Sequence, residues 1–218
     1  MEARPEIDAA VAVIVGNFNP AIFQPAWLAG TGLITSEDQA DLELGVLIPA
    51  MASFRVGWLT LEVQHTRLSA TANDAAHFVL LRDFVVGVLS MLEHTPVSAC
   101  GINRNMHFKT NSSDEWHAIG HRLIPKTPFA GLIEAPGTRS LTVQGARQGS
   151  VARYMQMTIQ PSTVVDNGIL FGLNEHYDKP EVASASAASD AIHQNWDAAL
   201  AHFLLAAQTV LERTRSAT

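Results

Sequence analysis

Hydrophobic and polar residues alternate along several short segments of this chain, as they do in strands that bury one face. In residues 58–64, leucine and valine occupy every second position, between Trp, Thr, Glu and Gln. Because successive side chains of a strand point to opposite faces, this pattern predicts a strand with one covered face. Residues 154–160 alternate in the same way, and the turn Asp166-Asn167-Gly168 predicts a hairpin leading into residues 169–174.

Apolar runs predict the remaining strands. Residues 9–15 are apolar throughout and end at Gly16-Asn17, which indicates a buried strand. Residues 97–108 and 140–145 are also expected to be strands, and residues 65–71 can extend the sheet or form a hairpin partner.

Two long segments repeat their apolar residues with the period of a helix. In residues 75–93 the apolar residues cover most of the circumference, which predicts a helix packed on more than one side. Residues 190–213 form the clearest amphipathic helix, preceded by a small-residue linker at 179–189. Its predicted apolar stripe consists of Ile192, Trp196, Ala199, Leu200, Phe203, Leu204, Ala207, Val210 and Leu211.

Capping signals predict two shorter helices. Thr35-Ser36, followed by two acidic residues, indicates a helix start, and this helix is expected to end near Leu44-Gly45. Residues 111–115 cap another helix that continues to Leu123 and is stopped by Pro125.

These elements predict an α+β fold with one repeated order: strand, short helix, several antiparallel strands, long helix. We expect two β-α-β(n)-α halves, residues 1–96 and 97–218, which form one compact unit with a mostly antiparallel sheet and the long helices on one face. The halves are not visibly alike in residues, so the repeat is one of element order. This order resembles the tandem plan of the TATA-binding-protein shape, which implies that two sheets join into one curved surface.

A second resemblance rests on two short segments. The strand Gly101-Ile102-Asn103-Arg104 and the segment Gln160-Pro161-Ser162 are similar to those of a sparsely distributed family of uncharacterised bacterial proteins. That family supplies no activity, so it implies no site residue for this chain.

The composition indicates how much of the surface is buried and in which compartment the protein is expected. Only 16% of the residues are charged, against about 25% in an average globular domain, so much of the surface is expected to be buried in a core or a subunit interface. The single cysteine, Cys100, permits no intrachain disulfide, and the N-terminus lacks the pattern of a secretory signal. We therefore expect a cytoplasmic protein, and the apolar-rich stretch 75–92 is too short and too charged to span a membrane.

The net charge of −7 is unevenly distributed along the chain. Residues 98–160 carry seven Lys and Arg but only three Asp and Glu, so the middle third could face an anionic partner. Arginines on a solvated sheet face would give the same asymmetry, and we favour this interpretation. The acidic balance of the whole chain argues against nucleic-acid binding.

Two histidines form the best candidate for chemistry. His117 and His121 are four residues apart on a predicted helix, a spacing that lets both imidazoles reach one zinc ion. Glu115, His107 and His176 are candidate third ligands. Ala118 stands where the zincin pattern requires a glutamate base, and the alternative is a pair of ordinary helix-surface histidines.

Polar strand residues form a second candidate site. Asn103, Arg104, Asn105 and His107 are expected to line a polar face of the sheet, where they could recognise an anion or a peptide or simply be solvated. Asn174 and His176 belong to a cluster, residues 174–178, which is most simply interpreted as a polar strand terminus. Cys100 is expected to be buried and inert.

Three functions remain open from the sequence. The first is a non-enzymatic binding or assembly module without a cofactor, which contacts a protein partner or a second copy of the chain through a sheet face or a subunit interface and forms a homo-oligomer. The second is a metal-dependent hydrolase that uses His117 and His121. The third is a sheet that binds nucleic acid.

Overall fold

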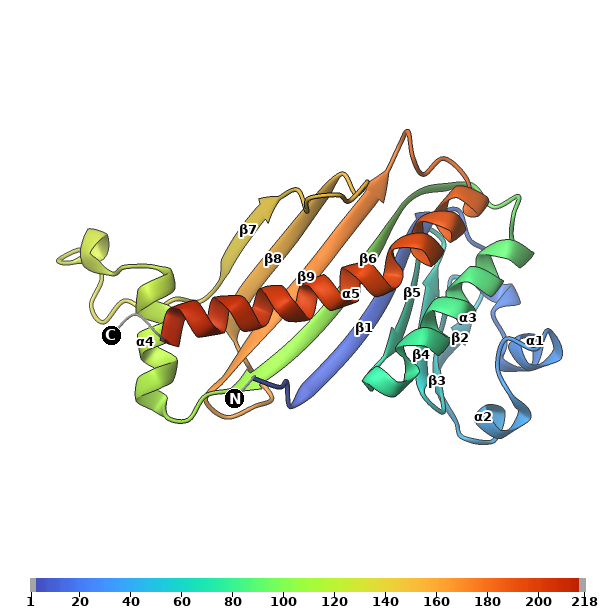
Figure 1. Ribbon diagram of the computed structural model, residues 1–218. Helices are drawn as coiled ribbons and strands as arrows, with labels where there is room; N and C mark the ends of the chain where they lie inside the picture. The colour runs from blue at the N-terminus through green and yellow to red at the C-terminus, as the bar shows by residue number, and fades with distance from the viewer. Residues whose placement is uncertain (1–2, 216–218) are drawn as a thin grey trace.

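Nine strands form one continuous antiparallel sheet, and two long helices lie across one of its faces (Figure 1). The computed structural model describes residues 3–215. The strands are β1 (Ile7–Gly16), β2 (Leu42–Ile48), β3 (Met51–Val56), β4 (Leu59–Gln64), β5 (Arg67–Ala72), β6 (Val97–Lys109), β7 (Leu141–Gly145), β8 (Tyr154–Pro161) and β9 (Gly168–Asp178). The helices are η1 (Pro20–Ile22), α1 (Pro25–Gly30), α2 (Ser36–Ala40), η2 (Ala75–His77), α3 (Phe78–Met91), α4 (Ser113–Leu123), η3 (Thr127–Phe129) and α5 (Ala185–Arg215).

The strand order places β1 and β6 side by side in the middle of the sheet. From one edge to the other the order is β2-β3-β4-β5-β1-β6-β9-β8-β7, and every neighbouring pair is antiparallel. The predicted α+β class, the antiparallel sheet and the packing of long helices against it are confirmed. Within residues 3–215, none of the helices combines the length and hydropathy that crossing a membrane requires.

The core lies between the sheet and the helix layer of α3 and α5. The apolar stripe predicted for α5 faces this core: Ile192, Trp196 and Phe203 are fully buried, while Leu204 and Val210 lie partly buried beside them. Strand residues on the helix side, such as Ile14 and Phe171, complete the layer. Burial of these apolar side chains supplies the main free energy that holds helices and sheet together.

Two helix boundaries differ from the sequence expectation. The helix that starts after Thr35 ends at Ala40, because residues 42–48 pair with β3 instead of continuing the helical turns. At the other end of the chain, α5 starts at Ala185, inside the predicted linker. The Ser184 hydroxyl accepts a hydrogen bond from the backbone N–H of Ala187, and Ala185 and Ala188 of this first turn are good helix formers that pack into the core.

Helix α3 is packed on more than one side, as expected, because it contacts both the sheet and α5. Its apolar residues nevertheless extend beyond the covered faces, since Val79 and Leu80 are 50% and 47% exposed. One sheet and one neighbouring helix cover only part of the helix circumference, so the additional apolar residues of α3 face outward.

Arg104 lies on the helix side of the sheet, whereas the sequence pattern predicted it on a polar face. It points into the helix side of the sheet, where Nε and Nη2 donate to the two carboxylate oxygens of Asp8 on β1, at 2.8 and 2.6 Å. Its Nη1 donates to the Leu200 carbonyl of α5 at 2.6 Å, and the guanidinium lies 5.4 Å from the Phe78 ring of α3. With side-chain exposures of 8% and 16%, Arg104 and Asp8 form an interior ion pair that joins four elements.

We predict that Asp8→Ala lowers the free energy of unfolding by about 3–5 kcal/mol, because it leaves the Arg104 charge buried without its carboxylate. Urea denaturation followed by circular dichroism measures this change. The matched control is Glu43→Ala, which removes one partner of the exposed Arg55–Glu43 pair and should change stability by less than about 1 kcal/mol. Equal effects of the two variants would contradict the structural role of Arg104.

A second prediction concerns Cys100, the only cysteine of the chain, which lies on the helix side of β6. Burial raises the pKa of its thiol to about 12, so the reactive thiolate is scarce at neutral pH. We expect no reaction with a disulfide reagent at pH 8 in the native protein and one reacted thiol per chain in denaturant. Rapid labelling of the native protein would show that β6 is accessible from its helix side.

Candidate functional site

The face of the sheet that α3 and α5 leave open carries a row of carboxamides across four neighbouring strands. The register places Asn103 of β6 opposite Asn174 of β9, Asn174 opposite Gln156 of β8, and Gln156 opposite Gln144 of β7. We call these four residues the amide row. Neighbouring strands are about 4.8 Å apart, so the row extends over roughly 14 Å.

A hollow lies beside the amide row because the next residue of β9 on the same face is a glycine, which has no side chain. Gly172 is paired with Asn105 on one side and with Thr158 on the other. The sheet-face hollow has a volume of about 310 Å³ and is lined by Asn103, Asn105, Gln156, Thr158, Gln160, Leu170, Gly172, Leu173 and Asn174. None of these lining residues carries a charge, and a Cβ atom on Gly172 would lie 3.3 Å from Asn105 Oδ1.

Contacts with the sheet hold part of the amide row in place. The Asn103 side-chain nitrogen donates to the Val11 carbonyl at 3.1 Å and to the Gly101 carbonyl at 3.3 Å. Gly101 permits the close approach of Asn174, since a Cβ atom there would lie 2.9 Å from Asn174 Oδ1. The Asn103 carboxamide is therefore oriented before any ligand arrives, which reduces the entropy lost on binding.

A histidine lies at each end of the sheet-face hollow. His176 stacks on Tyr154, with ring centroids 4.8 Å apart and planes 14° from parallel. At the other end, His107 Nδ1 lies 2.8 Å from Ser162 Oγ, and burial lowers the pKa of His107. The same Ser162 oxygen accepts hydrogen bonds from the backbone N–H groups of Val164 and Val165, so this hydroxyl stabilises the turn between β8 and β9.

The polar residues around Glu175 in the sequence predicted a solvated strand terminus, but Glu175 itself is not solvated. It is fully buried on the helix side, where Arg147 forms an ion pair with it. Tyr177 Oη donates to the same carboxylate at 2.6 Å and Ser150 Oγ at 3.3 Å. Burial, together with this contact to Glu175, raises the pKa of Tyr177, and the hydrogen bond to Glu175 raises the pKa of Arg147. This network fastens the β7–β8 loop to β9.

Tyr177 is two residues from Glu175, but the residues that the network draws from the β7–β8 loop are distant in the sequence, so the neighbours of Glu175 did not indicate them. Arg147 is 28 residues away from Glu175 along the chain. His176, next to Glu175, points to the open face, where its Nε2 lies 3.6 Å from Asp178 Oδ2. The two side chains therefore serve different surfaces.

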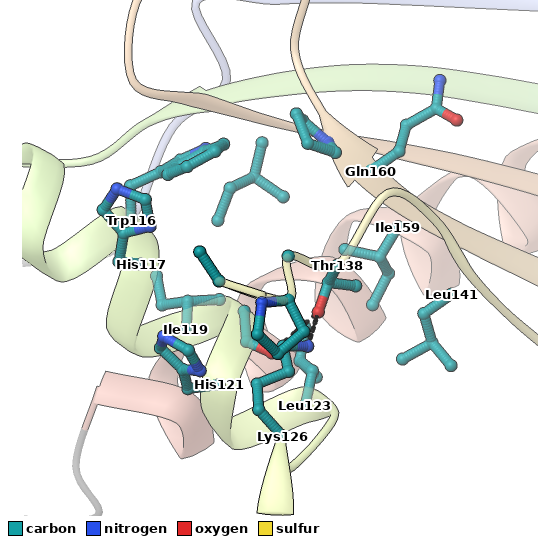
Figure 2. Close-up of a pocket in the computed structure, with 16 residues that line it drawn as sticks. Trp116, His117, Ile119, His121, Leu123, Lys126, Thr138, Leu141, Ile159 and Gln160 are labelled. Carbon is teal, nitrogen blue, oxygen red and sulfur yellow. Dashed lines mark hydrogen bonds between the residues drawn. The ribbon is translucent and has the colours of Figure 1, made fainter. Parts of the chain in front are cut away.

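The histidine pair of α4 lines a separate cavity of about 410 Å³ on the helix side of β8 and β9 (Figure 2). His117 and His121 share one face of the helix and are both exposed. Within residues 3–215, no three His, Cys, Asp or Glu side chains are placed to hold one metal ion. His107 and His176, two of the proposed third ligands, lie on the open sheet face, and zinc binding by the α4 pair stays a prediction.

Glu115, the third proposed ligand, is engaged elsewhere. Arg215 Nε donates to its carboxylate at 2.6 Å, and the backbone and side-chain nitrogens of Asn111 donate at 2.6 and 2.8 Å. Burial acts to raise the pKa of Glu115, but these hydrogen bonds outweigh it, and the net pKa is lowered. Glu115 thus connects the start of α4 to the end of α5.

Several basic residues of the middle third are paired. Arg104, Arg147 and Arg153 each form an ion pair with a carboxylate, and Arg122 donates to the Thr214 carbonyl at the end of α5. No Lys or Arg lines the sheet-face hollow. The local surplus of positive charge is therefore not concentrated at this hollow.

The sequence identified Asn103, Asn105, His107, Asn174 and His176, which the structure brings together on one face. It missed Gln144, Gln156, Thr158 and Gly172, because their proximity depends on strand register; the isolated Gly172 within an apolar strand was the one available signal. No protein-family model matches the chain, and no match is found among curated proteins. The geometry is therefore the basis for any proposed function.

We predict that an NMR titration gives His107 a pKa below the reference value of about 6.5. Because the folded state binds its proton less readily than the unfolded chain, His107 should make the free energy of unfolding decrease as the pH falls below about 6.5. His107→Gln should remove this contribution from the pH dependence of urea midpoints. A His107 pKa above 6.5 would contradict the burial of this side chain beside Ser162.

Proposed function

We propose that this protein is a non-enzymatic binding module whose open sheet face holds an uncharged, polar segment of a partner protein. The observation that carries the proposal is the amide row beside an uncharged hollow. Asn103 uses its two amide protons within the sheet and offers its oxygen as an acceptor. The other three carboxamides carry both donors and an acceptor, which matches the N–H and C=O groups of a peptide and the side chains of Asn, Gln, Ser and Thr.

The absence of charge in the lining of the hollow argues for a neutral segment. A charged ligand group placed there would lose hydration without gaining an opposite charge. Nucleic acid fits this surface poorly, because phosphate contacts from Lys and Arg dominate its affinity for proteins. The alternative of a metal-dependent hydrolase depends on His117 and His121 alone.

The anchoring of the opposite face supports a role in recognition. The helix side of β6 and β9 is packed under α5, while Asn103 and Asn105 on β6 and Asn174 on β9 face outward. Side chains on such a supported sheet are held more rigidly than side chains on a loop, which favours specific hydrogen bonding.

We further propose that the chain consists of two structurally related halves. The first strand of each half, β1 or β6, lies at the centre, and the remaining strands of its half follow outward. A homo-oligomer is also part of this proposal, supported by the half-exposed Val79 and Leu80 on α3. A buried, lone Cys100 is compatible with the cytoplasm.

Selection from a random peptide display library tests the main proposal. We predict that the enriched peptides are uncharged and polar, and that Gly172→Val reduces their affinity at least about tenfold by filling the hollow. Valine suits a strand, so the fold should persist. Thr60→Val, on the open face of β4, is the matched control and should bind normally.

Two results would overturn this proposal. One is the absence of any enriched peptide, or an enrichment in charged peptides. The other is equal affinity of the selected peptides for the native protein and the Gly172→Val variant, measured by isothermal titration calorimetry.

A further inference from the structure

The cavity beside α4 is bounded by three parts of the chain. One wall is α4, the second is the segment that leads from η3 to β7, and the floor consists of residues from β7, β8 and β9 (Figure 2). A volume of about 410 Å³ lies within the range of small-molecule sites, roughly 300–1,000 Å³. The cavity is separate from the sheet-face hollow, and only Gln160 lines both.

Most of the cavity lining is apolar. Its large hydrophobic side chains are Trp116, Ile119, Leu123, Leu141, Ile159 and Ile169. Trp116 uses its one donor within the protein, where Nε1 donates to the Gly168 carbonyl at 3.0 Å. A ligand therefore meets the hydrocarbon surface of this indole, and the cavity favours a ligand with an apolar body.

The polar groups of the lining include a chain of hydrogen bonds that starts at a lysine. Lys126 Nζ donates to Thr138 Oγ1, and this hydroxyl donates to the Gly120 carbonyl of α4 at 3.2 Å. Both side chains are half-buried, so the ammonium is positioned by the fold. Among residues 3–215, Lys126 is in no ion pair, and an ammonium has three protons to donate.

The ionisable groups that line the cavity are all basic. Its lining includes Lys126 and the two histidines, but no Asp or Glu. An anionic group placed there gains an attractive charge and a hydrogen-bond donor without facing a carboxylate. The histidines add nitrogen atoms on the α4 side of the cavity, as Figure 2 shows.

We propose that this cavity binds a small amphiphilic carboxylate, of the kind represented by a medium-chain fatty acid. The apolar body lies between α4 and the floor of β8 and β9, and the carboxylate accepts a hydrogen bond from Lys126. Lys126 thus sets the preference for an anionic head group, while the surrounding hydrocarbon supplies the affinity. This site is independent of the partner segment proposed for the open sheet face.

Isothermal titration calorimetry with octanoate, 1-octanol and octylammonium tests the proposal on the full chain. We expect one octanoate per chain, with weaker binding of the alcohol and of the amine. Gly120→Leu places a large side chain in the cavity, and leucine favours a helix more than glycine does. It should reduce octanoate affinity at least about tenfold, whereas Gly120→Ala is the matched control, since its Cβ meets nothing nearer than 3.9 Å.

The head-group preference is tested separately at Lys126. Lys126→Met should weaken octanoate binding about tenfold and leave the 1-octanol affinity unchanged, whereas Lys126→Arg should retain the preference for octanoate. If Lys126 only stabilises the end of α4, the methionine variant melts at a lower temperature but binds octanoate as the native protein does. Unchanged octanoate binding in the methionine variant would overturn the proposal. The same holds if the native protein does not bind octanoate, if it binds octanoate and 1-octanol equally, or if Gly120→Leu leaves octanoate binding unchanged.

Discussion

The ion pair between Arg104 and Asp8 is the constraint on which the arrangement of sheet and helices depends. Each charge is costly to bury alone, so both side chains must meet inside the helix layer, where α5 contributes the Leu200 carbonyl. Once Arg104 points to the helices, the alternation of β6 directs Asn103 and Asn105 to the other face. The burial of Arg104, together with that of Ile102 and Met106 on the same side of β6, therefore places the β6 member of the amide row on the open face.

The local periods in the sequence predicted most of the strands and both long helices. The apolar stripe of α5 corresponds to a helix with one buried face, and the alternation in residues 154–160 corresponds to β8, where Ile159 is buried and Met155 and Met157 pack partly buried against the core. The length of α2 could not be read in this way, because the residues after it become β2 by pairing with β3. Such a ladder is a tertiary interaction that competes with local helix propensity.

Sequence patterns do not predict which charged residues of a strand are buried. Within an alternating strand a charged residue signals the solvated side, yet Arg104 and Glu175 both face the helices. Their partners come from distant segments, such as Asp8, which is 96 residues away from Arg104. The same difficulty applies to the site: Asn103 and Asn174 are visible as polar strand residues, but only the register shows that Gln156 continues their row.

Both proposed binding sites depend on the register of β8. Gln156 and Thr158 face the sheet-face hollow, whereas Ile159 belongs to the floor of the cavity beside α4. A shift of one residue would exchange the two faces, placing methionine and isoleucine in the hollow and a threonine among the hydrocarbon side chains. The turn at Asn167, which has a positive φ of 52°, closes the β8–β9 hairpin and fixes this register. One local turn therefore determines the chemistry of two surfaces on opposite sides of the sheet.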